Sequence, residues 1–400
     1  MAKNENSRVM VPLDTAYELV DAMRAKFYDH LPHEKISIDD ALSRRLYSDI
    51  ISMERSPRQH ISTMDGYAVK AGDTYPLELI GEVYAGDMPD HIGHGKTVYI
   101  TTGAALPEGS DAVLRIEDAK LEGKQLSGLP VEQWTSVIKA GSDFEVGDHI
   151  LSKGTVITPA MIGLLHGAGI DEVEVYRKPR IAVISTGDEI RNGMTKNTNA
   201  PTACAMLKTW GCAPECLDTV RDTYEDTVAA LDKASSQYDA VVTIGGVSVG
   251  KKDFVVKTIV EGGDVVFHGY RIRPGKPLLV SYYKGKPVFS LPGKPTGAFT
   301  AMELIVSRFL RGELRNAGVC LPVSSDLEFP KDGFEYVVYV KIIGDKAVPM
   351  GFPDSPLKLF KGPRYGVSIV SSSPRSMVTD GFFMAKENVK AGTLVNVQLL

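Results

Sequence analysis

Strand-like and helix-like segments alternate between residues 178 and 316, and this alternation constrains the fold more than any other feature of the sequence. Apolar or β-branched runs typical of buried strands occur at residues 180–185, 239–244, 278–281 and 287–291. Helical patterns lie at residues 200–210, 224–235, 254–261 and 295–311. Such alternation is typical of a doubly wound, mostly parallel sheet. We therefore predict a central α/β domain over residues 178–316.

Three further domains are predicted around this α/β domain, since 400 residues exceed what one hydrophobic core usually serves. Residues 8–50 and 132–177 form an N-terminal helical and linker domain, with one helix near residues 15–27 and a second starting near Ser37. Residues 51–131, rich in glycine, proline and short β-branched runs, form an inserted β-rich domain. Residues 317–400 carry further strand-like runs and form a C-terminal β domain.

Composition argues against two classes of partner. The formal net charge is −5 and the pI is about 6.0, whereas nucleic-acid binders carry a basic surface. No apolar stretch approaches the roughly 20 residues that cross a bilayer, and the first ten residues lack the apolar core of a signal peptide. The four cysteines do not have the spacing of a zinc site, so we expect buried free thiols and a cytoplasmic location.

Three glycine-containing loops follow predicted strands of the α/β domain. They are residues 185–189, 245–253 and 291–297. In open α/β sheets, ligands bind at the carboxyl ends of the strands. The second loop predicts a phosphate site, because its glycines let consecutive N–H groups face an anion. Its Gly245-x4-Gly250-Lys251 spacing matches a P-loop only in part, since Lys252 stands where Ser or Thr should hold magnesium.

Charged residues gather at the same predicted strand ends. The carboxylates are Asp188, Glu189, Asp222 and Asp253, whose hard oxygen ligands suit magnesium bridging phosphates. The cations are Arg273, Lys276 and Lys294. Acids and cations around a phosphate cradle are typical of sites that cleave a phosphoanhydride. Any one of these charges, taken alone, can be an ordinary solvated surface group. Glycine turns after strands also occur in loops that have only a structural role.

Short motifs occur in a fixed order at residues 62–68, 102–104 with 107–109, 140–143, 185–189, 245–253, 274–277 and 291–293. Taken together, this set resembles the molybdopterin molybdenumtransferases, the family that includes the E domain of gephyrin. The resemblance spans roughly residues 10–315. It implies a four-part subunit that forms a homodimer, with a C-terminal β-barrel. It also implies an active cleft between the α/β domain of one subunit and the β domain of its partner.

By the same resemblance, the substrate is adenylylated molybdopterin, and molybdate or tungstate is inserted as AMP is released with the help of Mg²⁺. The implied catalytic residues are Asp65, Glu189, Asp222 and Asp253, of which the last three are also the implied metal ligands. The implied substrate-binding residues are Thr102, Asp143, Thr186, Gly187, Asp188, Gly245, Gly246, Ser248, Gly250, Arg273, Lys276, Pro292, Gly293 and Lys294. Other cofactor-assembly proteins are possible further partners.

The sequence departs from the family pattern at several positions. Lys294 and Gly297 replace the usual Asn and Ser of the third loop, and Asn197 stands where an Asp is typical. The arginines expected near residues 334–341 are absent, and Tyr336 and Tyr339 occur there instead. Extra positive charge at Lys294 could tighten oxyanion binding or change which oxyanion is preferred, while Arg375 could replace a lost cation.

Two alternatives remain open beside a transferase. One is a non-catalytic, pterin-binding scaffold or carrier, which has no need for the acidic residues Asp65, Glu189, Asp222 and Asp253. The other is a hydrolase of a different nucleotide pyrophosphate on the same α/β domain. Asp65 and the Thr102 segment, which lie outside that domain, count against the hydrolase.

Overall fold

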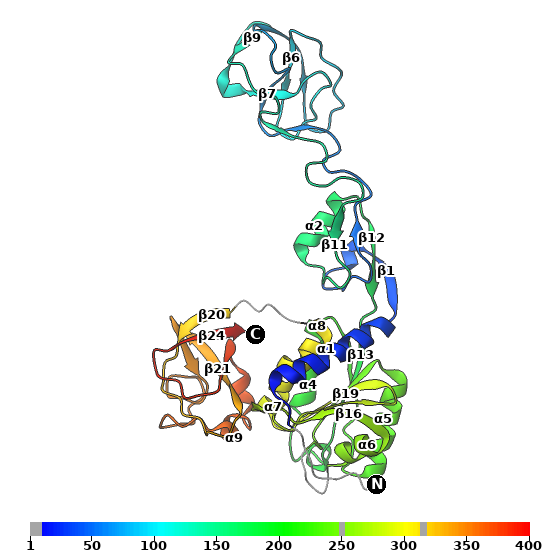
Figure 1. The fold of residues 1–400 in the computed structure, drawn as a ribbon, viewed down its shortest axis with the longest axis vertical. Helices are drawn as coiled ribbons and strands as arrows, with labels where there is room; N and C mark the ends of the chain where they lie inside the picture. The colour runs from blue at the N-terminus through cyan, green and yellow to red at the C-terminus, as the bar shows by residue number, and fades with distance from the viewer. Residues whose placement is uncertain (1–9, 248–252, 313–317) are drawn as a thin grey trace. The chain divides into compact units, whose positions relative to one another are not determined.

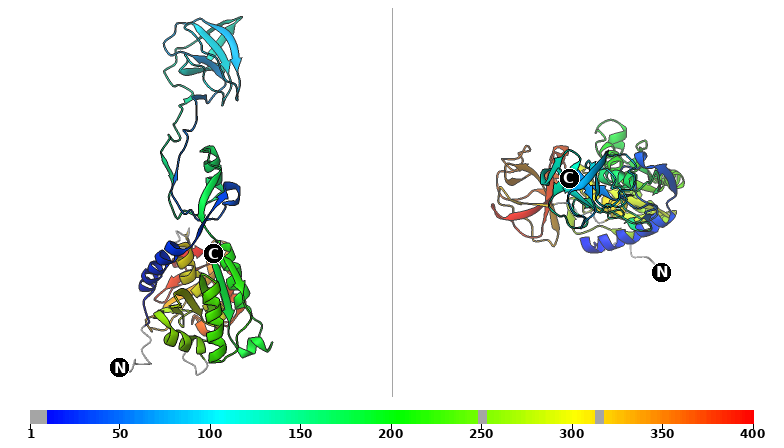
Figure 2. Two further views of the ribbon diagram at one scale, coloured as in Figure 1. Left: turned by 90° about the vertical axis from the view of Figure 1, so that its right-hand side faces the viewer. Right: turned by 90° about the horizontal axis from the view of Figure 1, so that it is seen from above.

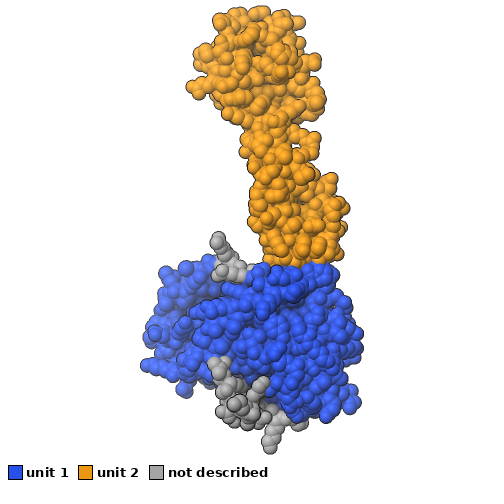
Figure 3. All heavy atoms as spheres, turned by 45° about the vertical axis from the view of Figure 1, so that its right-hand side comes forward, with its two compact units in different colours: residues 1–32, 177–400 blue, residues 33–176 orange. Residues whose placement is uncertain are grey.

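The computed structural model describes residues 10–247, 253–312 and 318–400, and the chain divides into two compact units (Figures 1 and 3). The first unit comprises Met1–Pro32 and Arg177–Leu400, and the second comprises His33–Tyr176. This division is coarser than the predicted four domains, and it groups the N-terminal helix with the α/β part. In the described residues, no helix is both long and apolar enough to span a membrane.

A six-stranded mixed sheet forms the centre of the first unit. In spatial order its strands are β14 (Ala213–Cys216), β13 (Arg180–Ser185), β15 (Ala240–Ile244), β19 (Lys286–Leu291), β18 (Leu279–Tyr283) and β16 (Gly263–His268). The first four strands are parallel, and β18 and β16 continue the sheet in antiparallel fashion. Because β14 lies on one side of β13 and β15 on the other, the order reverses at β13, where such sheets bind ligands.

Helices cover both faces of this sheet, as predicted for an α/β domain (Figures 1 and 2). They are α1 (Leu13–His30), α3 (Asp188–Arg191), α4 (Asn199–Thr209), α5 (Tyr224–Gln237), α6 (Phe254–Gly262), and the consecutive α7 (Pro295–Ala301), π-helical η3 (Met302–Val306) and α8 (Ser307–Arg311). Successive residues of a strand face opposite sides. Val288 accordingly packs with α5 and α6, while Phe289 contacts Phe309 of α8, whose ring lies 4.8 Å from that of Phe27 in α1.

The C-terminal part of the first unit is a second six-stranded sheet. Its strands are β17 (Ile272–Arg273), β21 (Glu335–Ile343), β23 (Gly381–Ala385), β24 (Leu394–Leu399) and β20 (Gly318–Pro322), with β22 (Lys346–Pro349) also paired to β21. Two short helices, α9 (Val367–Val370) and η4 (Pro374–Met377), precede β23. Since β17 comes from the α/β chain segment, the two sheets are joined through backbone pairing. The strand pairings do not establish a closed barrel, which stays a prediction.

The second unit contains a third six-stranded sheet and a smaller linker portion. The sheet consists of β7 (Ala112–Arg115), β4 (Gly66–Val69), β6 (Lys96–Ile100), β5 (Leu77–Val83), β9 (Gln125–Gly128) and β8 (Ala119–Glu122), and η2 (Ile116–Asp118) connects β7 to β8. The linker pairs are β1 (His33–Ser37) with β12 (Glu172–Tyr176), β2 (Ile50–Ile51) with β11 (His149–Leu151), and β3 (Ile61–Ser62) with β10 (Val137–Ile138). The linker also holds η1 (Ile38–Asp40) and α2 (Pro159–Gly167). Separate apolar clusters stabilise the linker and the sheet.

Two expectations from the sequence are wrong. The second helix expected from Ser37 is not formed: the chain makes the single turn η1 there, and the backbones of Arg45 and Leu46 instead pair with the distant Val156 and Val175. The cysteines are not all free thiols, since α4 packs beside β14 and Cys204 forms a disulfide with Cys216, their Cα atoms 6.7 Å apart. Within the described residues, Cys320 is an exposed free thiol.

Candidate functional site

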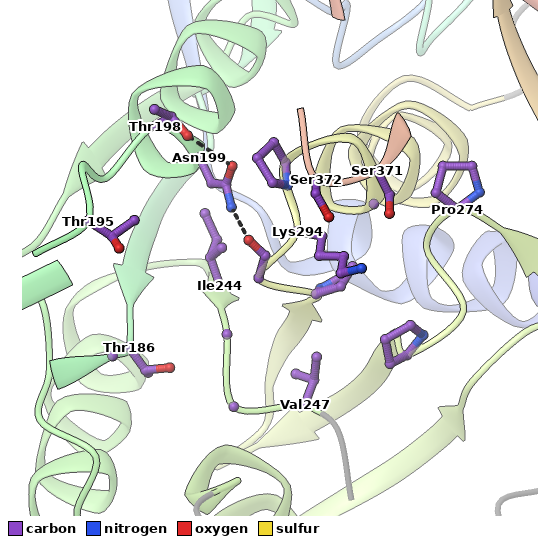
Figure 4. A pocket seen from close by; sticks show the side chains of 18 of the residues that line it. Thr186, Thr195, Thr198, Asn199, Ile244, Val247, Pro274, Lys294, Ser371 and Ser372 are labelled. Carbon is purple, nitrogen blue, oxygen red and sulfur yellow. Dashed lines mark hydrogen bonds between the residues drawn. The ribbon is translucent and has the colours of Figure 1, made fainter. Parts of the chain in front are cut away.

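The loops after β13, β15 and β19 lie side by side, because these strands are parallel neighbours and end at the same edge of the sheet. They surround a cavity of about 1010 Å³ (Figure 4). The start of α4, the 273–277 loop and the segment from Val367 to Pro374 complete its described walls. The cavity is therefore built at the switch point of the sheet, where the sequence predicted a ligand site.

Glycines with left-handed backbone angles let the first two loops approach each other closely. Gly245 and Gly246 have φ values of 98° and 65°, and Gly187 has 137°. A Cβ atom on Gly245 would lie 2.8 Å from the Thr186 Oγ1 and 3.1 Å from the Thr186 carbonyl oxygen. Side chains are excluded here by both the backbone angle and the available space. This wall of the cavity consequently presents backbone atoms to a ligand.

Carboxylates reach the cavity from the segments that follow β13, β14 and β15. Glu189, Asp222 and Asp253 line it, and Asp188 supports it through a reciprocal contact with Asp222. The Asp188 N–H donates to the Asp222 Oδ2, and the Asp222 N–H donates to the Asp188 Oδ1, both at 3.3 Å. Among the described residues, no three acidic, histidine or cysteine side chains form a group able to hold a metal ion. The acids therefore share a cavity without forming a complete metal centre.

Cations line the cavity from the 273–277 loop and the third loop. Arg273, Lys276 and Lys294 are all in its wall. The Arg273 guanidinium is 3.0 Å from an Asp332 carboxylate oxygen and lies over the Phe334 ring, 4.2 Å from its centroid. This pairing fixes the orientation of Arg273. The cavity thus has carboxylates from the β13–β15 side and cations from the loops that adjoin the C-terminal sheet.

Hydrogen bonds hold the third loop between α4 and the C-terminal part. The Asn199 Nδ2 donates to the Gly293 carbonyl at 2.8 Å (Figure 4). The buried Thr296 Oγ1 donates to the Val370 carbonyl at 3.2 Å and lies 2.6 Å from the Ser376 Oγ. These contacts join segments that are far apart in sequence, and they fix the loop that carries Lys294.

Most of the predicted site residues of the α/β domain meet in this cavity. Those in its wall are Thr186, Gly187, Glu189, Asp222, Gly245, Gly246, Asp253, Arg273, Lys276, Pro292, Gly293 and Lys294. Asp188 adjoins the wall, whereas Ser248 and Gly250 lie outside the described residues. The residues that sequence reasoning omitted include Asn199, Ser371 and Ser372. The likeness of residues 371–375 to the family's serine-bearing stretch was the signal for the last two, and the departure at residues 197–199 was the signal for Asn199.

Asp65, Thr102 and Asp143 belong to the second unit. The Asp65 Oδ1 accepts hydrogen bonds from the Thr102 N–H at 2.7 Å and from the Thr102 hydroxyl at 3.0 Å. Both hydrogen bonds lower the pKa of the exposed Asp65 carboxyl below its usual value, and the bond from the Thr102 backbone N–H has the larger effect. The Asp143 Oδ2 accepts a bond from the Ser56 hydroxyl at 3.3 Å. Asp65 and Thr102 thus contact each other within the second unit, and Thr102 holds Asp65 as an oriented carboxylate.

Comparison with known proteins relates both units to one group. Residues 11–169 match a family model described as the MoeA N-terminal region (domain I and II), and residues 182–312 match a probable molybdopterin binding domain. A molybdopterin molybdenumtransferase from Bacillus subtilis is 32% identical over 81% of this chain and 80% of its own length. One from Haemophilus influenzae is 33% identical over 72% and 75%. The crystal structure of a molybdopterin biosynthesis MoeA protein from Pyrococcus horikosii superimposes with a TM-score of 0.74 at 31% identity, covering 98% of this chain and 99% of that one.

Proposed function

This chain belongs to the molybdopterin molybdenumtransferase family, whose members are enzymes of molybdenum-cofactor biosynthesis, and from that premise we propose its reaction. It inserts molybdate or tungstate into adenylylated molybdopterin and releases AMP. The observation that carries this proposal is the single cavity at the carboxyl ends of β13, β15 and β19, which has carboxylates on one side and cations on another. A pyrophosphate-linked pterin and an oxyanion both need such opposed charges.

The residues of the cavity divide the binding task by their chemistry. The backbone of the second loop from Gly246 onward cradles a phosphate, because left-handed glycines can turn N–H groups toward an anion, while the Gly245 N–H donates to the Leu291 carbonyl at 3.0 Å and anchors the loop. Arg273 and Lys276 neutralise negative charge that develops as the phosphoanhydride breaks. Arg273 suits this task because Asp332 and Phe334 already hold its guanidinium in place.

The acidic side of the cavity fits a magnesium ion by the chemistry of its donors. Mg²⁺ in phosphate-handling sites uses one or two protein carboxylates together with substrate phosphates, so a complete protein cage is unnecessary. Glu189, Asp222 and Asp253 are the candidates, of which one or two would hold it, since the three do not form one metal-holding group. The ion supplies neutralisation of phosphate charge at this position. The reciprocal contact between Asp188 and Asp222 orients the Asp222 carboxylate for this role.

A second copy of the chain completes the site in this proposal. Asp65 and Thr102 come from the partner's β domain and Asp143 from its linker domain, and all three face the phosphate cradle. What supports their involvement is the state of Asp65, an exposed carboxylate kept ionised by two hydrogen bonds from Thr102. An acid held charged and solvent-accessible is suited to act on a substrate bound elsewhere.

AMP release by the purified full-length chain tests the reaction. Adenylylated molybdopterin and Mg²⁺ are incubated with molybdate, with tungstate or with neither, and AMP is quantified by chromatography. We expect AMP release that depends on the oxyanion. Tight pterin binding without AMP release would identify a carrier instead, and release without any oxyanion requirement would identify a hydrolase.

Matched variants test the assigned acids. Asp222→Asn should lower the rate of AMP release by about 100-fold or more, because it removes charge from the phosphate site. Glu225→Gln is the control, since Glu225 is an exposed acid in the first turn of α5 and does not line the cavity. Equal losses in the two variants would remove Asp222 from the site.

Mixed dimers test the shared site. Asp65→Asn and Asp253→Asn chains are each expected to be inactive alone. Combined in one preparation they should regain about a quarter to a half of the activity per site, because a heterodimer holds one cleft with both native acids. No recovery on mixing, with exchange of subunits verified by differently tagged chains, would show that both acids act within one subunit or in different sites.

A further inference from the structure

Tyr270 lies directly behind the 273–277 loop, which carries Arg273 and Lys276. Its side chain is fully buried, and among the described residues its hydroxyl oxygen has no hydrogen-bond partner. A Cβ atom on Gly275, which lines the cavity, would lie 2.9 Å from that hydroxyl oxygen. The hydroxyl therefore occupies the space that the missing side chain of Gly275 leaves behind the cavity wall.

A buried hydroxyl without a partner lowers the stability of the folded chain. It has lost its hydrogen bonds to water and has gained no others in exchange. Burial also raises the pKa of Tyr270 well above its usual value, so the group stays protonated and able to donate. A donor in this state gains free energy when a neighbouring acceptor comes within reach.

The Gly297 carbonyl is the acceptor that borders the same space. From a Cβ atom on Gly275, the Tyr270 hydroxyl lies at 2.9 Å, the Gly297 carbonyl oxygen at 3.3 Å and the Thr300 Cβ at 3.6 Å. The Thr300 hydroxyl is already engaged, because it donates to a carbonyl of its own helix and lies 2.8 Å from the Tyr339 hydroxyl. A carbonyl oxygen has two lone pairs, so that of Gly297 can accept a bond from outside α7.

The backbone of Tyr270 is fixed, so a closer contact depends on the loop in front of it. Tyr270 pairs with Val11 in an isolated β-bridge, and the next N–H along the chain donates to the Val11 carbonyl at 2.9 Å. The position of Gly275 sets the width of the space between the hydroxyl and the Gly297 carbonyl. A small shift of Gly275 toward an anion in the cavity opens that space for a hydrogen bond.

We propose that Tyr270 is a positioning residue for substrate binding, whose hydroxyl donates to the Gly297 carbonyl once the 273–277 loop holds a phosphate-bearing ligand. The hydrogen bond stabilises the arrangement in which Arg273 and Lys276 contact the ligand. This inference rests on the proposed function for the identity of that ligand, adenylylated molybdopterin.

Tyr270→Phe tests the proposal, because it keeps the ring and removes only the hydroxyl. Without ligand, the full-length variant should unfold about 1–3 °C above the native chain, since a buried unpaired donor is lost. Its Kd for adenylylated molybdopterin with Mg²⁺, measured by isothermal titration, should rise about tenfold, since the bound state loses a hydrogen bond. A purely structural role for the hydroxyl would change the stability and leave the affinity as it is.

Tyr282→Phe is the matched control. The Tyr282 hydroxyl oxygen is also buried, and it has no hydrogen-bond partner in the part of the chain that the structure describes. It lies on β18 opposite Pro287, near the start of β19 and therefore at the end of the sheet away from the cavity. We expect this variant to gain similar stability and to keep a Kd within about twofold of the native value.

The outcomes separate this inference from the proposed reaction. If the native chain binds the ligand and Tyr270→Phe binds it with the same Kd, the role of Tyr270 is overturned and the reaction is untouched. A lower unfolding temperature in Tyr270→Phe also overturns it, because the hydroxyl is then already paired in the free protein. Equal weakening in Tyr282→Phe overturns it as well, because the effect is then not local.

Selective weakening in Tyr270→Phe supports the inference even if no AMP is released. A native chain that does not bind adenylylated molybdopterin overturns the proposed function and this inference together.

Discussion

Replacing Gly245 by alanine would place a methyl group in the closest contact between the first two loops of the cavity. The new Cβ atom would lie 2.8 Å from the Thr186 Oγ1 and 3.1 Å from the Thr186 carbonyl oxygen. The hydroxyl can rotate away, but the carbonyl belongs to the backbone and can move only with the loop. The native φ of 98° also disfavours alanine.

The free-energy cost of Gly245→Ala has two parts, one from the backbone angle and one from the close contact. The left-handed backbone costs an alanine about 1–2 kcal/mol, and moving the carbonyl by a few tenths of an ångström adds about 1 kcal/mol. In the variant, the loop relieves this strain by moving away from its native position. A ligand can bind only when the loop returns to that position, so the strain reduces the affinity. We therefore expect Gly245→Ala to raise the Kd for adenylylated molybdopterin by about 30- to 150-fold, corresponding to about 2–3 kcal/mol.

A matched glycine at the opposite end of β19 separates strain from site geometry. Gly285 has a φ of 77°, and a Cβ atom added there meets no atom within 4 Å. Gly285→Ala should thus share the backbone penalty in thermal unfolding but change the ligand Kd by no more than about twofold. The measurement is the Kd for adenylylated molybdopterin of both variants, determined by titration. Native ligand affinity in Gly245→Ala would refute the argument that this contact shapes the phosphate site.

Three further outcomes follow from individual contacts. Thr296→Val should destabilise the protein by about 2 kcal/mol in urea unfolding, because it removes a buried hydroxyl and leaves the Ser376 hydroxyl without that partner. Asn199→Ala should raise the ligand Kd with little change in thermal unfolding, since the Gly293 carbonyl loses its donor at the exposed rim of the cavity. Burial raises the pKa of Glu303 to about 7 from 4.5. The folded state therefore binds the proton more tightly, so stability falls as pH rises from about 4.5 to 7 and then levels off, by up to about 3 kcal/mol. Glu303→Gln should abolish this fall in urea titrations at pH 5 and 8, and a fall of equal size in the variant would assign it to other groups.

Local sequence patterns determined the α/β part and the position of its site. Parallel strands must end at one edge of their sheet, so glycine loops after residues 185, 244 and 291 were bound to converge once the strands were recognised. The glycines were equally informative, because residues that adopt positive φ at a strand end indicate a close backbone approach. The resemblance to a family added Asp65 and Thr102, which no local pattern singled out.

Long-range pairing explains where sequence reasoning failed. Ile38, Leu42 and Leu46 recur at intervals that a helix satisfies, but backbone pairing of Arg45 and Leu46 with the distant Val156 and Val175 selects extended chain there. The disulfide between Cys204 and Cys216 likewise depends on α4 packing beside β14, which spacing along the chain does not reveal. Neither partner segment could be identified from the local pattern alone.

The sequence by itself determined the strand–helix alternation and the glycine loops, because both are properties of neighbouring residues. Only the tertiary structure decided which distant residues complete the cavity. Asn199 reaches Gly293 across 94 positions, and Thr296 reaches Val370 across 74. These contacts bring Ser371 and Ser372 beside Lys294. Such contacts depend on how whole sheets and helices pack together, so the order of residues along the chain does not reveal them.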